Sequence, residues 1–519
     1  MVPQNGHDED TSNVDSLPDR IAAILTDLTI FITGGTGFIG KVFIEKILRK
    51  NFDIREIVLL IRTKKGMAPE DRLDSILNNP LYDTVVSLRG KKAIRKKFRV
   101  VTGDVSLPDL GLSAADRQYI ISHVQVFIHT AASVRFDDPL KKAILHNTRG
   151  TKLVLDLARQ CNDLKGMCHI STAYCHPEVE LLEEKPYPPP ADPHKVIAAA
   201  ELLDEETLEI ISRRLIPKYI PNTYVFSKAL AEELVVQAMQ EGMPVGVIRP
   251  SIVIPVFFDP LPGWTDNING PTGLLIAAGK GVLRSMYGRG NCYADFIPVD
   301  VLASGIMIGI WDFATAKTVT LANFTSSSEV QVTWDELLDI GRKILNKIPL
   351  NGAVWYPDGG LTSSRLYHNF RVVFFHWLPA IIVDTILFLL RFEPVLIRVQ
   401  RRLTKGRELF EFYTNSQWYF KSDFGQLVRM RLNARELKEY KVDTTDANIP
   451  KYLEECAMVA RRYLLKQSDD TLPAARRHLR ILYVVDRLCK TIFACLLMWL
   501  IFKSFSSYFC TSSTQIQEL

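Results

Sequence analysis

The chain has 519 residues, of which 47% are hydrophobic and 23% are charged. At roughly 150 residues per domain this length allows about three domains, and the composition excludes a disordered polymer and a small disulfide scaffold. Lysine and arginine together number 63 against 58 acidic residues, so the bulk charge indicates no nucleic-acid partner.

The cysteines and the N-terminus indicate a cytosolic environment. The eight cysteines form no C-x-x-C pair and no set with zinc-ligand spacing, which predicts a reduced intracellular chain without a bound metal. The first twenty residues are polar and acidic and lack the apolar run of a signal peptide. We therefore expect a flexible terminus over residues 1–24 that stays in the cytosol.

Short apolar runs alternate with helical patterns between residues 28 and 255, as in a parallel sheet wrapped by helices. The predicted strands are 28–33, 56–61, 98–102, 125–130, 167–171 and 244–248. The predicted helices are 38–50, 140–161 and 222–239, where apolar positions recur three or four apart. The segment 185–193 (KPYPPPADP) is predicted to be a surface loop, because proline lacks an N–H and fixes φ. The expected fold class is α/β, with a Rossmann-type doubly wound parallel sheet.

From residue 361 onward the chain becomes helical and basic, and two stretches in it are unusually apolar. The first, 372–390, is long enough to span a membrane, but His376, Pro379 and Asp384 interrupt it. An aspartate at mid-membrane costs about 2.5–3.5 kcal/mol. We therefore expect a buried or half-inserted helix there in preference to a spanning one.

The second apolar stretch runs from Thr491 to Phe502 and continues past Lys503 to Cys510. One lysine in such a run is tolerable because its stem can reach the membrane surface. Basic residues favour the cytosolic side, so a tail anchor here leaves the bulk of the chain in the cytosol. The alternative is an amphipathic terminal helix packed on the preceding domain. The basic residues that precede the run are Arg476, Arg477, Arg480, Arg487 and Lys490.

The stretch TIFITGGTGFIGKVFIEKILRK reads as strand, glycine turn and helix, with glycines spaced by three. In this context one glycine makes the tight turn, one lets the backbone approach a pyrophosphate, and one lets the helix pack closely on the sheet. An ordinary glycine turn is the alternative. The residues predicted to bind a dinucleotide here are Gly34, Thr36, Gly37, Phe38, Ile39 and Gly40.

The end of the second strand indicates which dinucleotide is bound. A site that prefers NAD usually has an acid there to bond the ribose 2′-hydroxyl. This strand ends instead in Arg62, followed by Lys64 and Lys65, and the nearby Glu56 lies at the strand's other end. Three cations suit a 2′-phosphate, so we expect NADPH. The alternative is a solvated basic turn with Arg62 pointing away.

Tyr224 and Lys228 are four residues apart in a predicted helix, so they lie on one face of it. A free tyrosine has a pKa of about 10 and exchanges a proton poorly at neutral pH unless a nearby cation stabilises the phenolate. Lys228 can supply that charge. Ser171 and Thr172 follow the fifth strand, where a hydroxyl can bond a substrate carbonyl, although a helix N-cap is the alternative for them. Thr172 is the first choice of the two.

The motifs together resemble the alcohol-forming fatty acyl-CoA reductases, a branch of the extended short-chain dehydrogenases. The resemblance covers nearly the whole chain, including the basic helical region and the apolar tail. It implies NADPH-dependent four-electron reduction of a long-chain acyl-CoA to a primary alcohol and free CoA, through an aldehyde. The motifs are the glycine loop, LLIRTKKG at 59–66, GDV at 103–105, HTAASVRFD at 129–137, HISTAYCH at 169–176 and YVFSK at 224–228.

The resemblance also implies residue roles. Tyr224 would be the proton donor, Lys228 its activator and a ligand of the nicotinamide ribose, and Thr172 or Ser171 the carbonyl partner. Asp104 and Val105 would line the adenine pocket. His129, Thr130 and Ala131 would run under the cofactor, and Arg249 and Pro250 would lie near the nicotinamide.

Two alternatives to this function stay open: a membrane-bound extended dehydrogenase acting on a steroid or other lipid alcohol, and a catalytically silent lipid-binding relative. On the preferred hypothesis, residues 25–355 form the NADP-binding reductase domain with substrate-binding insertions, 356–470 a helical domain, and 471–519 a basic linker with an anchoring tail. The tail would hold the protein on the endoplasmic reticulum or the peroxisome, with the catalytic domain facing the cytosol. The oligomeric state is left open.

Overall fold

The computed structural model describes residues 14–64, 66–266, 268, 271–315, 321–326, 329–445 and 448–517, with backbone alone for 271 and 504–517. The chain forms two compact units that are interleaved along the sequence. Unit 1 comprises Met1–Asn267, Asn291–Trp334 and Phe412–Val459, and unit 2 comprises Ile268–Gly290, Asp335–Glu411 and Ala460–Leu519. The consecutive boundaries expected from the sequence stay a prediction.

Unit 1 is built on a seven-stranded sheet in which every neighbouring pair is parallel. The chain reverses its direction of winding between β1 and β4, and in open sheets of this kind ligands bind at the carboxyl ends beside that switch. The strands, in spatial order, are β11 (Leu321–Phe324), β7 (Val245–Pro250), β5 (Gly166–Ile170), β4 (Val126–His129), β1 (Thr29–Thr33), β2 (Glu56–Ile61) and β3 (Phe98–Thr102).

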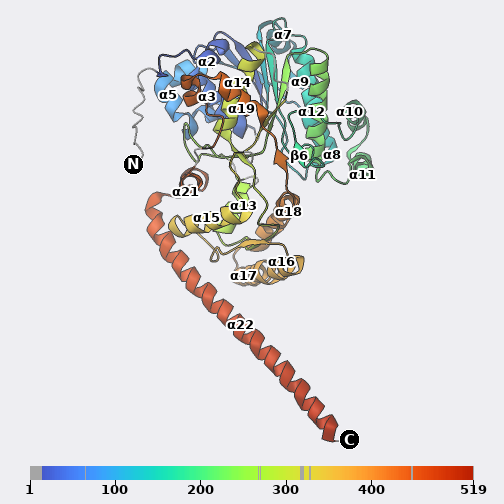
Figure 1. Ribbon diagram of the computed structural model, residues 1–519, viewed down its shortest axis with the longest axis vertical. Helices are drawn as coiled ribbons and strands as arrows, with labels where there is room; N and C mark the ends of the chain where they lie inside the picture. The colour runs from blue at the N-terminus through green and yellow to red at the C-terminus, as the bar shows by residue number, and fades with distance from the viewer. Residues whose placement is uncertain are drawn as a thin grey trace, which may run out of the picture. The chain divides into compact units, whose positions relative to one another are not determined.

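Helices cover both faces of this sheet (Figure 1). On one face α3 (Phe38–Lys50) packs against α14 (Val299–Thr315), and their apolar side chains share a core with Ile30 and Ile57 of the strands. On the other face α9 (Gly150–Ala158) and α12 (Thr223–Gln240) share a second core with strand residues such as Phe31 and Val58, whose side chains point to that face. Because both faces are buried, the strands are nearly continuous apolar runs.

The other described elements of unit 1 are short strand pairs and further helices. Two short parallel pairs lie outside the main sheet, β8 (Ile252–Ile254) with β10 (Phe296–Pro298) and β6 (Leu181–Leu182) with β13 (Tyr419–Phe420). The other helices are α2 (Arg20–Leu25), α4 (Pro69–Leu77), α5 (Asp83–Arg89), α6 (Lys91–Lys96), α7 (Ala114–His123), α8 (Leu140–Ala143), α10 (Pro193–Leu202), α11 (Glu205–Leu215), α19 (Asp423–Arg431), α20 (Ala434–Glu439) and α21 (Ile449–Val459).

Unit 2 is mainly helical, with one short strand pair, β9 (Ser285–Tyr287) with β12 (Gly360–Thr362). The last helix, α22, is drawn in Figure 1 as one continuous helix. About a third of the way along it, the buried Asp486 forms ion pairs with Arg284 and Lys490. The helices are α13 (Pro271–Gly279), α15 (Trp334–Lys347), α16 (Arg365–Val372), α17 (Leu378–Leu389), α18 (Leu396–Asn415) and α22 (Leu472–Gln517), with a π-helical turn at Val373–Trp377.

The α/β class with a helical C-terminal region is confirmed, and all six predicted strands are present. The seventh strand, β11, was not predicted. The predicted helix 140–161 is α8 and α9 joined by a π-helical segment, Ile144–Arg149. The segment 20–24 belongs to α2, whose Ile21 and Leu25 are fully buried, although a flexible terminus was expected there.

Within the described residues one helix is long and apolar enough to cross a membrane, the continuous helix Arg365–Leu389. Only 17% of its most apolar window is buried. The helix is therefore not buried in a protein core, which was one of the two arrangements expected for residues 372–390. The expected tail anchor, 491–510, extends beyond the side chains that the structure describes.

Candidate functional site

The glycine loop joins β1 to α3 at the carboxyl edge of the sheet, as the sequence predicts. Gly34 has φ +73°, and a Cβ there would lie 2.5 Å from the Thr130 Oγ1 atom and 2.6 Å from the Ala131 nitrogen. A Cβ on Gly40 would lie 2.5 Å from the Gly34 carbonyl oxygen. No side chain caps the first turn of α3, whose N-cap is Gly37. Its N–H groups are therefore free to bind an anion such as a pyrophosphate.

Two arginines lie beside this loop, one of which the sequence analysis missed. Arg62, at the end of β2, forms an ion pair with Asp104 at 3.2 Å and is half-exposed. Arg72, in α4, donates to the Thr36 Oγ1 atom at 3.0 Å and to the Arg62 carbonyl oxygen at 2.6 Å. Burial and the positive charge of Arg62 lower the pKa of Arg72. Two guanidinium groups this close favour an anion between them. Lys64 lies in the turn that follows, and Lys65 lies outside the described residues.

The ends of β3 and β4 complete the side of the site next to the glycine loop. Burial by itself would raise the pKa of Asp104, but hydrogen bonds from Ser106 and Arg62 lower it, so the carboxylate is charged. Val105 is buried beside it. His129 is held on both sides, by Thr33 at 2.6 Å and by Thr151 at 3.0 Å, and burial lowers its pKa to about 3. The imidazole is therefore neutral, and both of its nitrogens are hydrogen-bonded to threonine hydroxyls. Thr130 and Ala131 bond to the end of β1.

Tyr224 and Lys228 lie in the first half of α12, which begins at the N-cap residue Asn222. Burial raises the pKa of Tyr224, and a hydrogen bond with Thr172 opposes that rise. The Lys228 ammonium donates to the Ile170 carbonyl oxygen at 2.6 Å and lies 3.0 Å from the His169 Nε2 atom. Burial lowers the pKa of Lys228 to about 8. The helix therefore presents a protonated phenol and a lysine to the end of β5.

His169 is a partner of Lys228 that the sequence analysis did not single out. Burial and the charge of Lys228 hold its pKa well below the ordinary value, so the neutral ring accepts a hydrogen bond from the lysine ammonium. Its position in the motif HIST, two residues before Ser171, was the available signal.

Ser171 and Thr172 follow β5, and Thr172 is the residue that contacts Tyr224. Both are at least nine-tenths buried, and the Thr172 oxygen also accepts a weak hydrogen bond from the Tyr174 nitrogen. The Ser171 Oγ atom is buried and has no hydrogen-bond partner. An unpaired buried hydroxyl is costly, so this oxygen is suited to bind a group that enters the site. The segment after β5 thus brings the Thr172 hydroxyl to Tyr224 and leaves the neighbouring Ser171 hydroxyl without a partner.

A buried ion pair links α12 to β7 behind this point. Arg249 donates to Glu232 at 2.5 Å and also to the Glu183 and Lys185 carbonyl oxygens at 3.0 Å. The side chains of Arg249 and Glu232 are 0% and 2% exposed. The guanidinium is therefore fully engaged by the protein. A cofactor-binding role for Arg249 and Pro250 stays a prediction.

His176 and Cys175 adjoin the same carboxylate. Within the described residues, Cys175, His176 and Glu232 place a thiol, an imidazole and a carboxylate within 4.8 Å of one another. Burial by itself would lower the pKa of His176, but Cys175, Glu178 and Glu232 raise it. Because Glu232 is already paired with a guanidinium, this set acts as an ion-pair network that joins the Ser171–His176 segment to α12.

An aromatic cluster covers Tyr224 and includes a residue from far along the chain. The Phe136 ring lies 5.6 Å from the Tyr224 ring and 5.7 Å from the Tyr413 ring, measured between centroids. The Tyr413 ring meets the Tyr174 ring edge-on at 5.4 Å. The Tyr413 oxygen accepts a hydrogen bond from the Asn222 Nδ2 atom at 3.3 Å. Tyr413 therefore contacts both the neighbours of Tyr224 and the cap of its helix.

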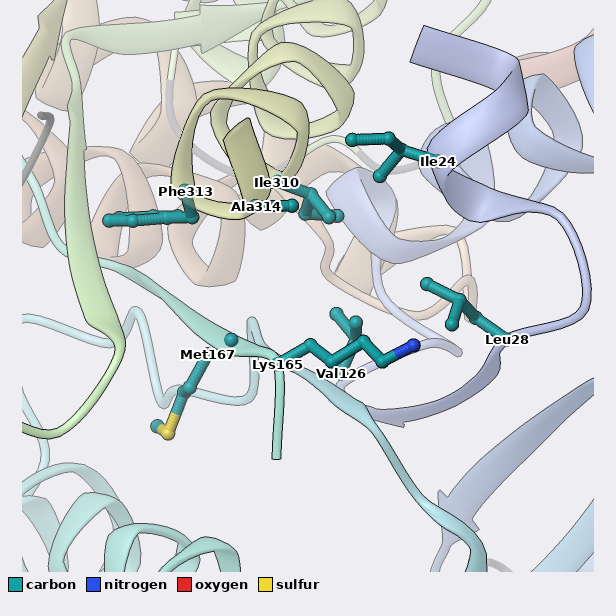
Figure 2. A pocket seen from close by; sticks show the side chains of 9 residues that line it. Ile24, Leu28, Val126, Lys165, Met167, Ile310, Phe313 and Ala314 are labelled. Atoms are coloured by element: carbon teal, nitrogen blue, oxygen red, sulfur yellow. The ribbon is translucent and has the colours of Figure 1, made fainter. Parts of the chain in front are cut away.

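Figure 2 shows a separate pocket of about 250 Å³ in unit 1. It is lined by Val126 and Met167, which lie at the amino ends of β4 and β5, and by Ile310, Phe313 and Ala314 of α14. The glycine loop and Tyr224 lie at the opposite, carboxyl edge of the sheet. This pocket is therefore not part of the candidate active site.

Comparison with known proteins agrees with this arrangement. A NAD-binding family model described as "Male sterility protein" matches residues 32–306, and a second model of the same description, Sterile, matches residues 375–467. Fatty acyl-CoA reductase 1 of Mus musculus is 34% identical over 478 residues, 91% of each chain. Fatty acyl-CoA reductase wat of Drosophila melanogaster is 32% identical over 478 residues, 92% of each chain.

Solved structures of low sequence identity share the fold. The terminal R domain from the myxalamid PKS-NRPS biosynthetic pathway aligns with a TM-score of 0.56 at 18% identity, covering 86% of this chain and 93% of that one. The reductase (R) domain of a non-ribosomal peptide synthetase from Mycobacterium tuberculosis aligns with a TM-score of 0.54 at 19% identity, covering 87% and 97%.

A dinucleotide loop, a Tyr–Lys helix and these matches define a nicotinamide-dependent oxidoreductase. Within that class the chain belongs to the fatty acyl-CoA reductase family, as the sequence motifs indicated.

Proposed function

We propose that the protein reduces a long-chain fatty acyl-CoA to the primary alcohol and free CoA, consuming two NADPH per substrate. The contact of Thr172 with the protonated Tyr224, one helical turn from the Lys228 ammonium, is the observation that carries this proposal. It supplies a hydroxyl, a proton donor and a cation at the carboxyl edge of a dinucleotide-binding sheet.

The preference for NADPH rests on the two arginines beside the glycine loop. The guanidinium groups of Arg62 and Arg72 lie at the end of β2, where the 2′-substituent of an adenosine ribose binds in this fold. Arg72 also bonds Thr36 within the loop, so a 2′-phosphate held there would be charge-paired on two sides. Lys64 and Lys65 would add to this potential. Asp104 and Val105 would line the adenine side.

When bound, NADPH supplies the hydride that each of the two reduction steps needs. In the first step Thr172, with Ser171 beside it, hydrogen-bonds the thioester oxygen and stabilises the negative charge that develops on it. Tyr224 then donates its proton to that oxygen, giving a hemithioacetal. Lys228 would hold the nicotinamide ribose, and its charge would stabilise the tyrosinate that remains. General acid help of this kind contributes about 10²–10⁴-fold in rate.

The hemithioacetal then breaks its carbon–sulfur bond. Its hydroxyl proton passes to the leaving sulfur, which yields an aldehyde and the CoA thiol. In the second step the same hydroxyls bind the aldehyde oxygen, and Tyr224, reprotonated from solvent, protonates it as the second hydride arrives. No cysteine nucleophile is required, because the thioester is already electrophilic.

We further propose that the protein is attached to a membrane of the endoplasmic reticulum or peroxisome by its C-terminal tail, with the active site in the cytosol. The exposed apolar side chains of α22 from Ile492 to Phe502 support this proposal, as do the basic residues before them. Truncation after Lys490 keeps the Asp486–Arg284 pair and removes the apolar run. We expect the truncation to weaken alkali-resistant attachment to the membrane, and release of the full-length protein by alkaline carbonate would contradict the tail anchor.

The reaction is tested by incubating the protein with palmitoyl-CoA and NADPH. We expect release of CoA thiol, oxidation of two NADPH for each thiol, and hexadecanol as product. Reduction of a lipid ketone without thiol release would favour the alternative dehydrogenase. NADPH binding with neither activity would favour the silent lipid-binding relative.

A further inference from the structure

The helix Arg365–Leu389 of unit 2 exposes an apolar face that no other described element covers. Its exposed side chains include Leu378, Ile382 and Ile386, which are 44%, 51% and 50% exposed. Phe388 and Leu389 at its end are 69% and 73% exposed. Monomeric proteins rarely leave such a continuous apolar surface in water, so this face marks an interaction site.

The polar residues that argue against membrane contact lie on the opposite face. His376 and Asp384, with Ala380 midway between them, are spaced by four, and each of the three is at most 2% exposed. The His376 Nε2 atom accepts a hydrogen bond from the Arg284 nitrogen at 3.0 Å. The helix therefore turns the stripe from His376 to Asp384 toward the rest of unit 2, and between Val373 and Leu389 its exposed residues are apolar except for Thr385, which is the pattern of a helix lying in a membrane interface.

Asp384 fixes how far the chain can extend outward beyond this helix. Its carboxylate accepts hydrogen bonds from the backbone nitrogens of Val395, Leu396 and Ile397 at 2.7–3.0 Å, which caps α18. The chain thus returns to the level of Asp384 within thirteen residues. At 1.5 Å per residue, the end of α17 lies only about 8 Å beyond Asp384. A segment that turns back so soon cannot cross the roughly 30 Å of a bilayer core.

The turn between α17 and α18 has an apolar tip with a cation in it. Arg391 has φ +62°, and Phe392, 64% exposed, bonds back to the Leu387 carbonyl oxygen. Residues 390–405 contain five basic residues and one acid, Glu393. Within unit 2 the Phe375 ring also lies 6.4 Å from the Phe493 ring of α22, so this face adjoins the apolar part of the tail helix. Apolar side chains flanked by arginines suit the acyl and phosphate layers of a lipid monolayer.

We propose that residues 378–395 form a hairpin tip that inserts into one leaflet of an anionic bilayer without spanning it. The tip places Phe388, Leu389 and Phe392 about 5–10 Å below the lipid phosphates, and Arg391 and Arg398 bind the phosphates themselves. The partner is the lipid surface that the tail enters. This attachment does not depend on the reductase chemistry.

The test measures depth in the full-length protein, reconstituted in phosphatidylcholine vesicles with 30% phosphatidylserine. A nitroxide is attached at Ile382→Cys, Leu389→Cys or Leu202→Cys, with Cys489, Cys495 and Cys510 replaced by serine. Leu202, 84% exposed in unit 1, is the aqueous control. The ratio of oxygen to nickel-complex accessibility gives the depth of each label. We expect Leu389 to be deepest, Ile382 shallower and Leu202 in water.

Either of two other results overturns the proposal. A Leu389 label as open to nickel as the Leu202 label means that the tip stays in water. An Ile382 label at the bilayer midplane with a Leu389 label near the far surface means that the helix spans. Phe388→Glu with Phe392→Glu should move the Ile382 label toward water, whereas the matched exposed pair Leu202→Glu with Ile210→Glu should not. The readout involves no turnover, so a failure of the proposed reaction is separate from a failure here.

Discussion

Two helices of this protein carry a series of residues at a spacing of four that includes polar side chains, and the two series have different partners. In α12 the series is Tyr224, Lys228 and Glu232, and the residues around it are buried on nearly every side. In Arg365–Leu389 the series is His376, Ala380 and Asp384, and these three residues and His368 are the buried ones. In the first helix the polar stripe lies at the candidate active site, and in the second it holds the helix against unit 2 so that the apolar residues face outward.

The difference teaches that spacing alone does not identify a site. Four-residue spacing places side chains on one face in both helices. What distinguishes them is the partner of that face: the end of β5 with Thr172 and His169 in α12, and the backbone of unit 2 in the other helix. Substitutions in the two helices should therefore have different consequences.

The largest expected effect is on the proton donor. Tyr224→Phe removes the phenol proton but keeps the buried ring, so kcat for alcohol formation should fall about 10²–10⁴-fold while NADPH binding stays nearly intact. Stopped-assay product analysis and cofactor fluorescence titration measure the two. Tyr219→Phe, at a half-exposed tyrosine before the helix, is the control and should change neither. Unchanged turnover in Tyr224→Phe would mean that Tyr224 of α12 is not the proton donor.

Next in size is the ion pair that supports this stripe. Glu232→Gln leaves the Arg249 guanidinium buried without its counter-charge, which should reduce the free energy of unfolding by about 3–5 kcal/mol. Glu233→Gln, on the less buried side of the same helix, should change it by less than about 0.5 kcal/mol. Urea unfolding followed by fluorescence compares the two. Recovery in the double variant Glu232→Gln with Arg249→Met would identify the unpaired charge as the cause.

The cofactor arginines give a smaller effect. Arg72→Ala removes a charged donor next to Thr36 and Arg62, so KM for NADPH should rise about 10- to 100-fold, since a hydrogen bond to a charged group contributes about 1.5–3 kcal/mol. KM for NADH should change little, because that cofactor lacks the 2′-phosphate. Lys92→Ala, an exposed cation in α6, is the control. Equal losses with both cofactors would mean that Arg72 only holds the loop.

The smallest effect separates the two helices most directly. Leu389→Gln, at an exposed position of α17, should change the free energy of unfolding in detergent by less than about 0.5 kcal/mol. Leu230→Gln, fully buried in α12, should lower it by about 3–5 kcal/mol, because apolar packing is lost and an amide is buried. Thermal unfolding of both variants measures this. A large loss in Leu389→Gln would show that its side chain is packed.

Much of the fold follows from the sequence because the strands are buried on both faces. Runs such as IVLLI are continuous in apolar residues, and the glycine loop fixes the first βα turn. The contact of Thr172 with Tyr224 was also predictable, because the carboxyl ends of parallel strands meet at one edge. The seventh strand was missed because two of the four residues of LANF are alanine and asparagine, which are uncommon in strands.

The rest of the site lacks a local signal. Arg72 belongs to PEDRLDSIL, which reads as a surface helix, and Glu232 stands beside Glu233 in a pattern typical of an exposed acid. Only the tertiary structure shows that one faces the cofactor loop and the other a buried guanidinium. Tyr413 lies almost two hundred residues after Tyr224, and no periodicity connects them. Such residues become visible when the partners of each buried polar atom are known.

Unit 1 is discontinuous, and this has a consequence for synthesis on the ribosome. The β6 strand cannot pair until β13 has been synthesised. The hydrophobic core that contains Ile21 also includes Phe424 and Tyr440, which are synthesised late. Translation at 5–20 residues per second takes roughly 10–40 s to proceed from the end of β7 to the end of α21. Until then Asn222 and the ring next to Tyr224 lack their Tyr413 partner. The nascent chain thus completes its candidate active site only after α18 has been synthesised, more than 150 residues after β7.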